Sequence, residues 1–66
     1  MSTDFLIAKH LSNYRRLQKI SQESLAIKLG KHRTFVSKVE NGNRILSFVE
    51  LQKYCNALNI DITIFL

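Results

Sequence analysis

Apolar side chains recur every three or four positions along most of this chain, which is the spacing of one face of an α-helix. A first helix is predicted over residues 4–18. A second follows Ser21, whose hydroxyl can accept hydrogen bonds from the free amides of a helix start, and stops at Gly30, which tolerates the left-handed backbone that ends helices. The inner faces of these two helices consist of Ile7, Leu11 and Tyr14, and of Leu25, Ala26 and Leu29.

The same periodicity predicts two more helices after Gly30. Residues 33–40 turn Val36 and Val39 inward, and this helix ends at Asn41-Gly42, a pair that tolerates positive φ. Ser47 followed by Glu50 makes a capping box for a fourth helix. The apolar face of that helix has spacings of three, four and three and consists of Phe48, Leu51, Cys55 and Leu58.

The last six residues, 61–66, fit two kinds of structure. Asp61 can cap a short helical turn, but β-branched residues follow it, and their pattern suits a strand about as well. We predict a helical turn here. The apolar side chains of this end either close the core of the chain or are buried by a second copy of it, and the sequence supports both readings equally. They are Ile62, Ile64, Phe65 and Leu66.

Length and composition are those of one small helical domain. The chain has 66 residues, of which 45% are hydrophobic, and a domain of this size buries only about 60% of the surface of its unfolded chain. Two glycines and no proline interrupt it, which favours compact helices over sandwiches and barrels. We therefore expect an all-α fold in a single domain over residues 1–66.

Several classes of protein are excluded by what the sequence lacks. Cys55 is the only cysteine and His10 and His32 are the only histidines, so neither an internal disulfide nor a four-ligand zinc site can form. There is no phosphate-binding glycine loop and no nucleophile beside a histidine. We expect no enzyme activity, no metal and no cofactor. No apolar run approaches the ~18 residues of a membrane span, and we expect a cytoplasmic protein.

Positive charge is concentrated around the third predicted helix. The chain carries a formal charge of +5, which favours polyanionic partners. Residues 31–44 hold four of the cations and a single acid, Glu40. Two short helices joined by a tight glycine-containing turn, with the second helix basic, are typical of the DNA-binding helix-turn-helix. This pattern predicts a protein that binds the major groove of DNA.

The chain resembles the lambda-repressor-like, or Xre, helix-turn-helix family. The resemblance rests on "SQESLAIKLG", on the spacing of Val36 and Val39, on "ENG" at 40–42 and on "S..E" at the start of the fourth helix. It implies a compact five-helix domain in which helix 3 lies in the major groove and helix 2 bridges the backbone. It also implies a partly buried salt bridge between Arg15 and Glu40, which tie helix 1 to the end of helix 3. The alternative for this pair is two solvated surface charges.

Four residues of helix 3 are predicted to read bases. At 100° per residue, inward valines at 36 and 39 force these side chains outward. They are Arg33, Thr34, Ser37 and Lys38. Arg33 is the strongest candidate, because a guanidinium matches O6 and N7 of guanine and such a contact contributes about 1 to 3 kcal/mol of discrimination. The alternative is an ordinary solvated helix face.

Contacts to the DNA backbone are predicted at both ends of the motif. The amide of Gln22 and the free backbone N–H groups around it can hold a phosphate oxygen at the start of helix 2, as the family position does. His32 replaces the Ser or Thr common at the start of helix 3, which we expect to be less firmly held. The remaining backbone candidates are Ser21, Lys31, His32, Asn41, Asn43 and Arg44.

From these observations we predict a sequence-specific double-stranded DNA-binding transcriptional regulator of the repressor or controller type. We expect it at the nucleoid, as a homodimer on a pseudo-palindromic operator. Two alternatives remain at this stage: an antitoxin that autoregulates its operon and also holds a toxin, and a protein-interaction module of the same fold. A steep dependence of affinity on salt and a high ratio of specific to random DNA binding separate a groove reader from such a module.

Overall fold

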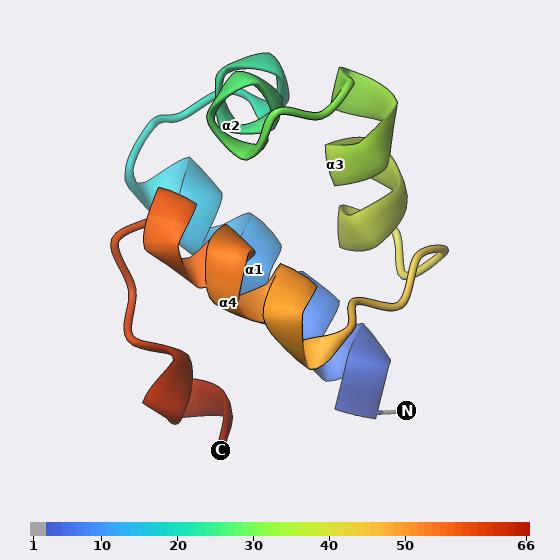
Figure 1. Cartoon of the computed structure of the whole chain (residues 1–66), viewed down its shortest axis with the longest axis vertical. Coiled ribbons are helices and arrows are strands. Elements are labelled where there is room, and N and C mark those ends of the chain that lie inside the picture. The colour runs from blue at the N-terminus through green and yellow to red at the C-terminus, as the bar shows by residue number, and fades with distance from the viewer. Residues whose placement is uncertain (1–2) are drawn as a thin grey trace.

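The computed structural model describes the backbone of residues 3–66 and the side chains from Phe5 onward. Four α-helices are followed by one 3₁₀ turn: α1 (Thr3–Leu17), α2 (Gln22–Leu29), α3 (Arg33–Glu40), α4 (Phe48–Ala57) and η1 (Ile62–Phe65). The all-α prediction is confirmed, and the expected fifth helix is this single 3₁₀ turn. In Figure 1, α2 and α3 form one end of the molecule and η1 lies at the other.

The helices α2 and α4 and the turn η1 begin at the capping residues that the sequence predicts. Ser21 Oγ accepts from the amide of Ser24 at 3.0 Å, and Gly30 ends α2 in the left-handed conformation with a φ of 67°. Ser47 and Glu50 form the reciprocal capping box at the start of α4, with bonds of 2.9 and 3.1 Å. Asp61 caps η1 by accepting from the amide of Thr63 at 2.9 Å. Each cap satisfies amides that a helix start leaves unpaired.

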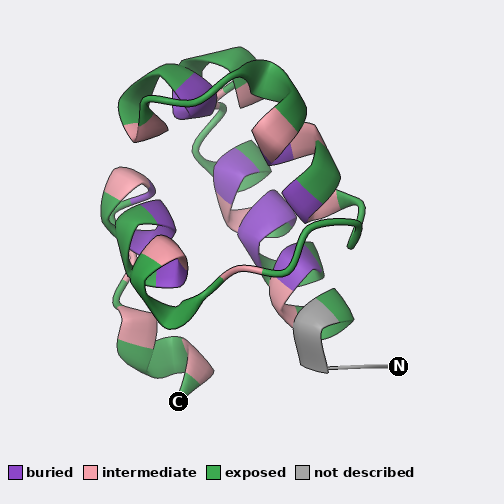
Figure 2. Ribbon diagram, turned by 45° about the vertical axis from the view of Figure 1, so that its right-hand side comes forward, coloured by how far each residue is buried: buried purple, intermediate pink, exposed green. Residues whose placement is uncertain are grey.

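The core lies where the four α-helices meet (Figure 2). It consists of Leu11, Leu25, Ala26, Val36, Val39, Leu51, Tyr54, Cys55 and Leu58. The prediction for Phe48 is wrong: its side chain is 58% exposed, because the first residue of α4 lies at the edge of the molecule, one turn before the core layer that begins at Leu51. Tyr54, which the sequence reading passed over, is fully buried.

The C-terminal turn divides its apolar side chains between the interior and the surface. Ile62 and Phe65 are half-buried and pack against the core. Ile64 and Leu66 remain 49% and 79% exposed. Ile62 and Phe65 therefore fit the prediction that this segment closes the core, whereas Ile64 and Leu66 fit the prediction that a second copy of the chain buries it. Across the described part of the chain, no helix is long and apolar enough to cross a membrane.

Candidate nucleic-acid interface

A rigid pair of short helices presents the outer face of α3. Only three residues, 30 to 32, separate α2 from α3. Val36 and Val39 are 0% and 1% exposed, so the inward orientation predicted for them is confirmed. On the opposite side of the helix Arg33, Thr34 and Lys38 are exposed, whereas Ser37 is half-buried. The outer face is therefore basic and polar while the inner face belongs to the core.

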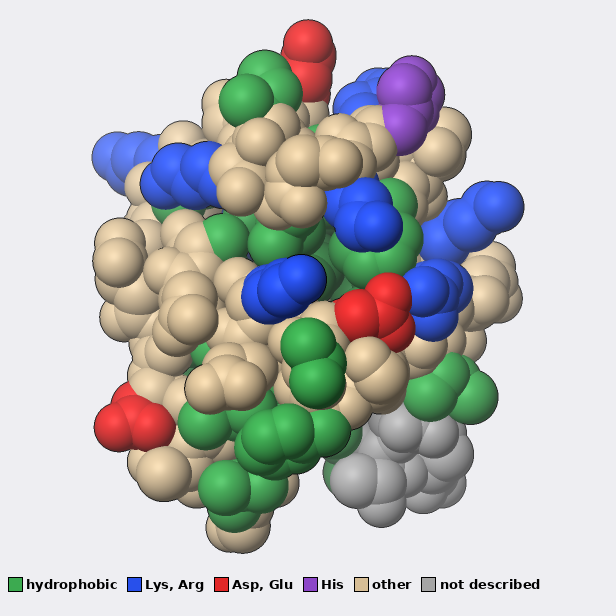
Figure 3. All heavy atoms as spheres, viewed as in Figure 1, with side chains coloured by type: hydrophobic (Ala, Val, Ile, Leu, Met, Phe, Trp, Pro, Cys, Tyr) green, Lys and Arg blue, Asp and Glu red, His purple; other side chains and the backbone are tan. Residues whose placement is uncertain are grey.

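No described residue is a partner for the two cationic side chains on this face. Among the described residues the side chains of Arg33 and Lys38 take part in no hydrogen bond, ion pair or ring contact. Figure 3 shows that Lys and Arg side chains gather on the half of the molecule formed by α2 and α3, while hydrophobic side chains gather near η1. Unpaired, exposed cations on a projecting helix suit a polyanion, since an ion pair made inside the protein would have to be broken first.

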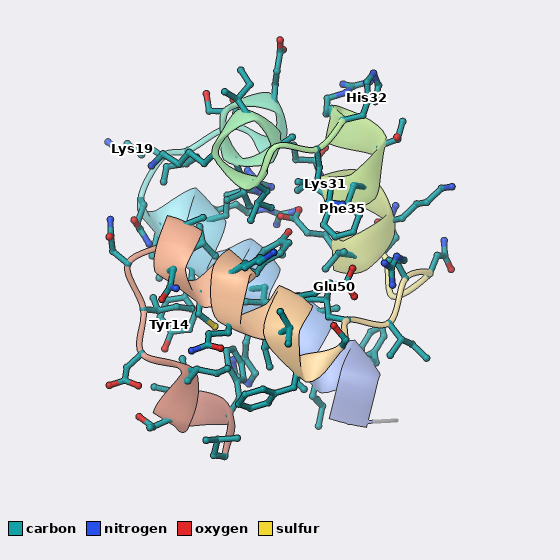
Figure 4. All side chains as sticks on the ribbon, viewed as in Figure 1. Tyr14, Lys19, Lys31, His32, Phe35 and Glu50 are labelled. Atoms are coloured by element: carbon teal, nitrogen blue, oxygen red, sulfur yellow. The ribbon has the colours of Figure 1, made fainter. Side chains whose placement is uncertain are left out.

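The start of α3 is capped by an imidazole. His32 Nδ1 accepts from the amide of Thr34 at 3.2 Å and lies 3.1 Å from the hydroxyl oxygen of the same residue. His32 is therefore the N-cap of α3, in place of the Ser or Thr that is common at this position. Its ring lies at the start of the helix (Figure 4). Because Nδ1 accepts, the ring must carry its proton on Nε2 in this arrangement.

At one flank of α3, two candidate backbone contacts meet over an aromatic ring. The Lys31 ammonium and the Arg44 guanidinium lie 5.6 and 5.4 Å from the centre of the Phe35 ring, close enough for cation–π interaction. Arg44 also donates to Glu50 at 2.6 Å. Figure 4 shows Lys31, Phe35 and Glu50 in the space between α3 and α4. Arg44 is thus directed toward α4, and part of its charge is already paired.

At the other flank, a buried network joins three helices. Arg15 of α1 donates to both carboxylate oxygens of Glu40 at the end of α3, at 2.6 and 2.9 Å, and to the carbonyl of Ile20 at 2.8 Å. Gln22, the first residue of α2, donates from Nε2 to Glu40 Oε1 at 3.1 Å. The Arg15 and Glu40 side chains are only 10% and 4% exposed. The pair is thus internal and its charges are not solvated at the surface.

These bonds keep Glu40 ionised. Burial by itself raises the pKa of a carboxyl group, but the hydrogen bonds from Arg15, Gln22 and Ser12 and the charge of Arg15 outweigh it and hold the pKa of Glu40 below its ordinary value. The bond to Glu40 correspondingly raises the pKa of Arg15. Both groups are charged at neutral pH.

The helix ends differ in the backbone donors that they leave free. At α2 the cap occupies the Ser24 amide, which leaves the amides of Gln22 and Glu23 without a partner among the described residues. In the loop after α3, the amides of Asn41 and Asn43 already donate to the carbonyls of Ser37 and Lys38, at 3.0 and 2.9 Å. These two amides are therefore occupied, whereas the Arg44 amide has no partner among the described residues and the side chains of the loop are exposed.

Two contacts at the site were not predicted from the sequence. The bond from Gln22 to Glu40 joins residues 18 positions apart and depends on how α2 packs against α3. The bond from Arg44 to Glu50 gives the capping-box glutamate a second role. Within the described residues no group of His, Cys, Asp and Glu side chains has an arrangement that could hold a metal ion.

Sequence comparisons agree with this geometry. The family model described as "Helix-turn-helix" matches residues 11–65. The control protein C.SmaI of Serratia marcescens is 33% identical over 57 residues, which are 86% of this chain and 68% of that protein.

Solved structures show the same arrangement of helices. The restriction-modification controller protein C.AhdI of Aeromonas hydrophila is 32% identical, with a TM-score of 0.85 over 94% of this chain and 90% of its own. The controller protein C.Esp1396I, solved as a tetramer with its natural 35-base-pair operator, is 23% identical, with a TM-score of 0.89 over 98% and 86% of the two chains. The second likeness concerns the fold alone. On the match to the helix-turn-helix model and the likeness to C.SmaI and C.AhdI, the chain belongs to the Xre-type helix-turn-helix family of DNA-binding regulators.

Proposed function

We propose that the protein is a sequence-specific transcriptional regulator of the controller type, which inserts α3 into the major groove of an operator. The observation that carries this proposal is the exposed outer face of α3, where the side chains of Arg33 and Lys38 have no partner among the described residues. The likeness to C.SmaI and C.AhdI supports a role as controller of a restriction-modification locus. Such a regulator works at the nucleoid, in the cytoplasm.

The proposed contacts fall into two groups. Arg33 reads a guanine, Lys38 reaches a base or a phosphate, and Thr34 and Ser37 adjust the fit to neighbouring bases. The backbone group sets the register of the protein on DNA without reading sequence, and it consists of Ser21, Gln22, Lys31, His32, Asn41, Asn43 and Arg44. The free amides at the start of α2 support the phosphate contact of Gln22. Arg44 must first leave Glu50, so its contribution is smaller than its charge suggests.

The test is selection of bound duplexes from a random pool, with the wild type and with Arg33→Ala. We expect the wild type to select a partly palindromic motif and Arg33→Ala to lose preference at one position of each half-site, by about 10- to 100-fold. Lys9→Ala is the matched control, because it removes one exposed cation from α1 and should leave the motif unchanged. An unchanged motif with Arg33→Ala would exclude Arg33 as a base reader, and no motif from the wild type would refute the function.

We further propose a homodimer that places two copies of α3 about 34 Å apart on one side of the DNA. The exposed Ile64 in η1 and Leu66 directly after it support a contact through the C-terminal end. Figure 3 shows hydrophobic side chains on the surface at this end of the molecule. The half-buried Ile62 and Phe65 would form the floor of that contact.

Light scattering tests the dimer, with the protein free and on its selected duplex. Ile64→Ser combined with Leu66→Ser should shift the protein to monomer and weaken operator binding at least about tenfold, because two half-sites then bind independently. Ile27→Ser is the control, since Ile27 is an equally apolar and 72% exposed residue on α2. A wild type that remains monomeric in both states would contradict the dimer.

A further inference from the structure

We infer that Glu40 is a positioning residue for DNA binding: it holds the side-chain amide of Gln22 in the orientation that presents an N–H group to a phosphate. The inference rests on the proposed function. It assigns to the buried pair of Arg15 and Glu40 a role in binding, beyond its structural role of tying α1 to α3. The observation that carries it is the 3.1 Å bond from Gln22 Nε2 to Glu40 Oε1.

The direction of this bond determines which end of the amide faces Glu40. An ionised carboxylate only accepts hydrogen bonds, so Gln22 must turn its NH₂ group toward Glu40 and cannot turn its carbonyl oxygen there. One of the two N–H groups of Nε2 is used in this bond, and the other stays free. Without Glu40 the amide could rotate by half a turn and present its carbonyl oxygen, which a phosphate oxygen repels.

Arg15 makes this arrangement compatible with DNA. An unpaired carboxylate close to the phosphates of the DNA backbone would weaken binding, because like charges repel each other. Arg15 neutralises Glu40 through bonds to both of its oxygens, at 2.6 and 2.9 Å, while Oε1 still accepts from Gln22. The three side chains therefore act in sequence: Arg15 fixes and neutralises Glu40, Glu40 orients Gln22, and Gln22 contacts the phosphate.

The position of Gln22 adds to the effect. It is the first residue of α2, beside the backbone amides of residues 22 and 23 that have no partner among the described residues. An amide held at this place adds one fixed donor to a group of donors that already favours an anion. A fixed donor binds more tightly than a free one, because its rotamer is already ordered before DNA arrives.

A double-mutant experiment tests the inference. Gln22→Ala is made in the wild type and in a background that carries Arg15→Met with Glu40→Met, because replacing a buried ion pair by apolar side chains usually preserves the fold. Binding is measured on the selected duplex and on a random duplex, and folding is checked by circular dichroism. We expect Gln22→Ala to weaken binding of both duplexes about tenfold in the wild type, and less than about twofold in the Met background.

Equal losses in the two backgrounds would overturn the inference and leave the proposed function intact. A wild type that binds no DNA would instead refute the proposed function. If the Met background does not fold, the wild type alone decides the matter by ¹⁵N NMR of the Gln22 amide. On addition of the selected duplex, the proton bonded to Glu40 should keep its resonance and the second proton should move downfield. Loss of the Glu40-bonded signal on DNA would overturn the inference.

Discussion

Two ion pairs of this molecule have the same length and different surroundings. Arg15 and Glu40 approach to 2.6 Å, and so do Arg44 and Glu50. The first pair has side chains that are 10% and 4% exposed, whereas those of the second are 42% and 28% exposed. The contact distance alone does not say what an ion pair contributes, because solvent screens the exposed pair much more strongly than the buried pair.

The difference in burial also separates their roles. The buried pair cannot be rearranged without opening the junction of α1, α2 and α3, so its contribution to DNA binding acts through Gln22. The exposed pair can open without cost to the core, so under the proposed function Arg44 can exchange Glu50 for a phosphate. On that proposal one pair fixes the geometry of the interface, and the other adjusts the affinity for DNA.

The largest difference between the two ion pairs should appear in the free energy of unfolding when one partner of the buried pair is removed. Arg15→Ala leaves the Glu40 carboxylate buried without its counter-ion, and we expect a loss of about 3 to 5 kcal/mol in the free energy of unfolding. A domain of this size has little more stability than that, so much of the variant should be unfolded at 25 °C. Arg16→Ala is the control in urea denaturation, because Arg16 is the exposed neighbour on α1. A loss under about 1 kcal/mol for Arg15→Ala would contradict the assignment.

Lowering the pH should have the second-largest effect, because protonation of Glu40 weakens the buried pair. The folded-state pKa of Glu40 is lowered, so its stabilising contribution is complete at neutral pH and is lost as the pH falls through the ordinary carboxyl range, below about 4. The urea concentration at the unfolding midpoint of the wild type should therefore decrease as the pH is lowered from about 6 to about 3. This decrease should be clearly smaller in the variant that combines Arg15→Met with Glu40→Met. In the Glu50→Gln variant it should be nearly as large as in the wild type. Parallel declines in all three proteins would show that Glu40 is not the main titrating group.

A change in the exposed pair should have the smallest effect, and this effect should appear in the affinity for DNA and not in stability. Glu50→Gln keeps the capping box, because a glutamine oxygen can still accept from the Ser47 amide, but it removes the charge that holds Arg44. We expect the thermal midpoint to change little and the affinity for the selected duplex to rise about threefold at low salt.

Asp61→Asn is the matched control for this change. It removes the same charge at the cap of η1, where the carboxylate accepts from Thr63, and it leaves Arg44 untouched. Its effect on affinity should be smaller than that of Glu50→Gln. An equal gain from the two variants would attribute the effect to net charge, and would rule out a specific restraint on Arg44.

Much of the fold follows from local signals in the sequence. Ser21, Gly30, Ser47 and Asp61 act within one turn of their own positions, which is why the helix boundaries could be predicted closely. The inward valines of α3 follow from helical periodicity in the same way. The prediction for Phe48 is wrong because periodicity gives the face of a helix and not the depth of the core, and at the edge of the molecule the described residues leave that side chain 58% exposed.

The candidate site could be predicted only in part. The outward position of Arg33 follows from that of Val36, since both lie on one helix. The partner of Gln22 depends on how α2 packs against α3, and the partner of Arg44 depends on the course of the loop before α4. Their spacing in the sequence indicates neither bond. His32 shows a third case: its ring caps α3 by accepting from the amide two residues on, whereas the serine caps accept from the amide three residues on, and the sequence pattern predicts only a weaker helix start.

The unpaired outer face of α3 has a consequence for how such a protein can diverge. Among the described residues the side chains of Arg33 and Lys38 make no hydrogen bond or ion pair, so under the proposed function most exchanges at these positions alter the preferred target while the scaffold keeps its shape. New recognition can therefore arise by single steps, each compatible with a folded intermediate. After duplication of a locus, two copies could acquire separate operators without compensating changes in the interior.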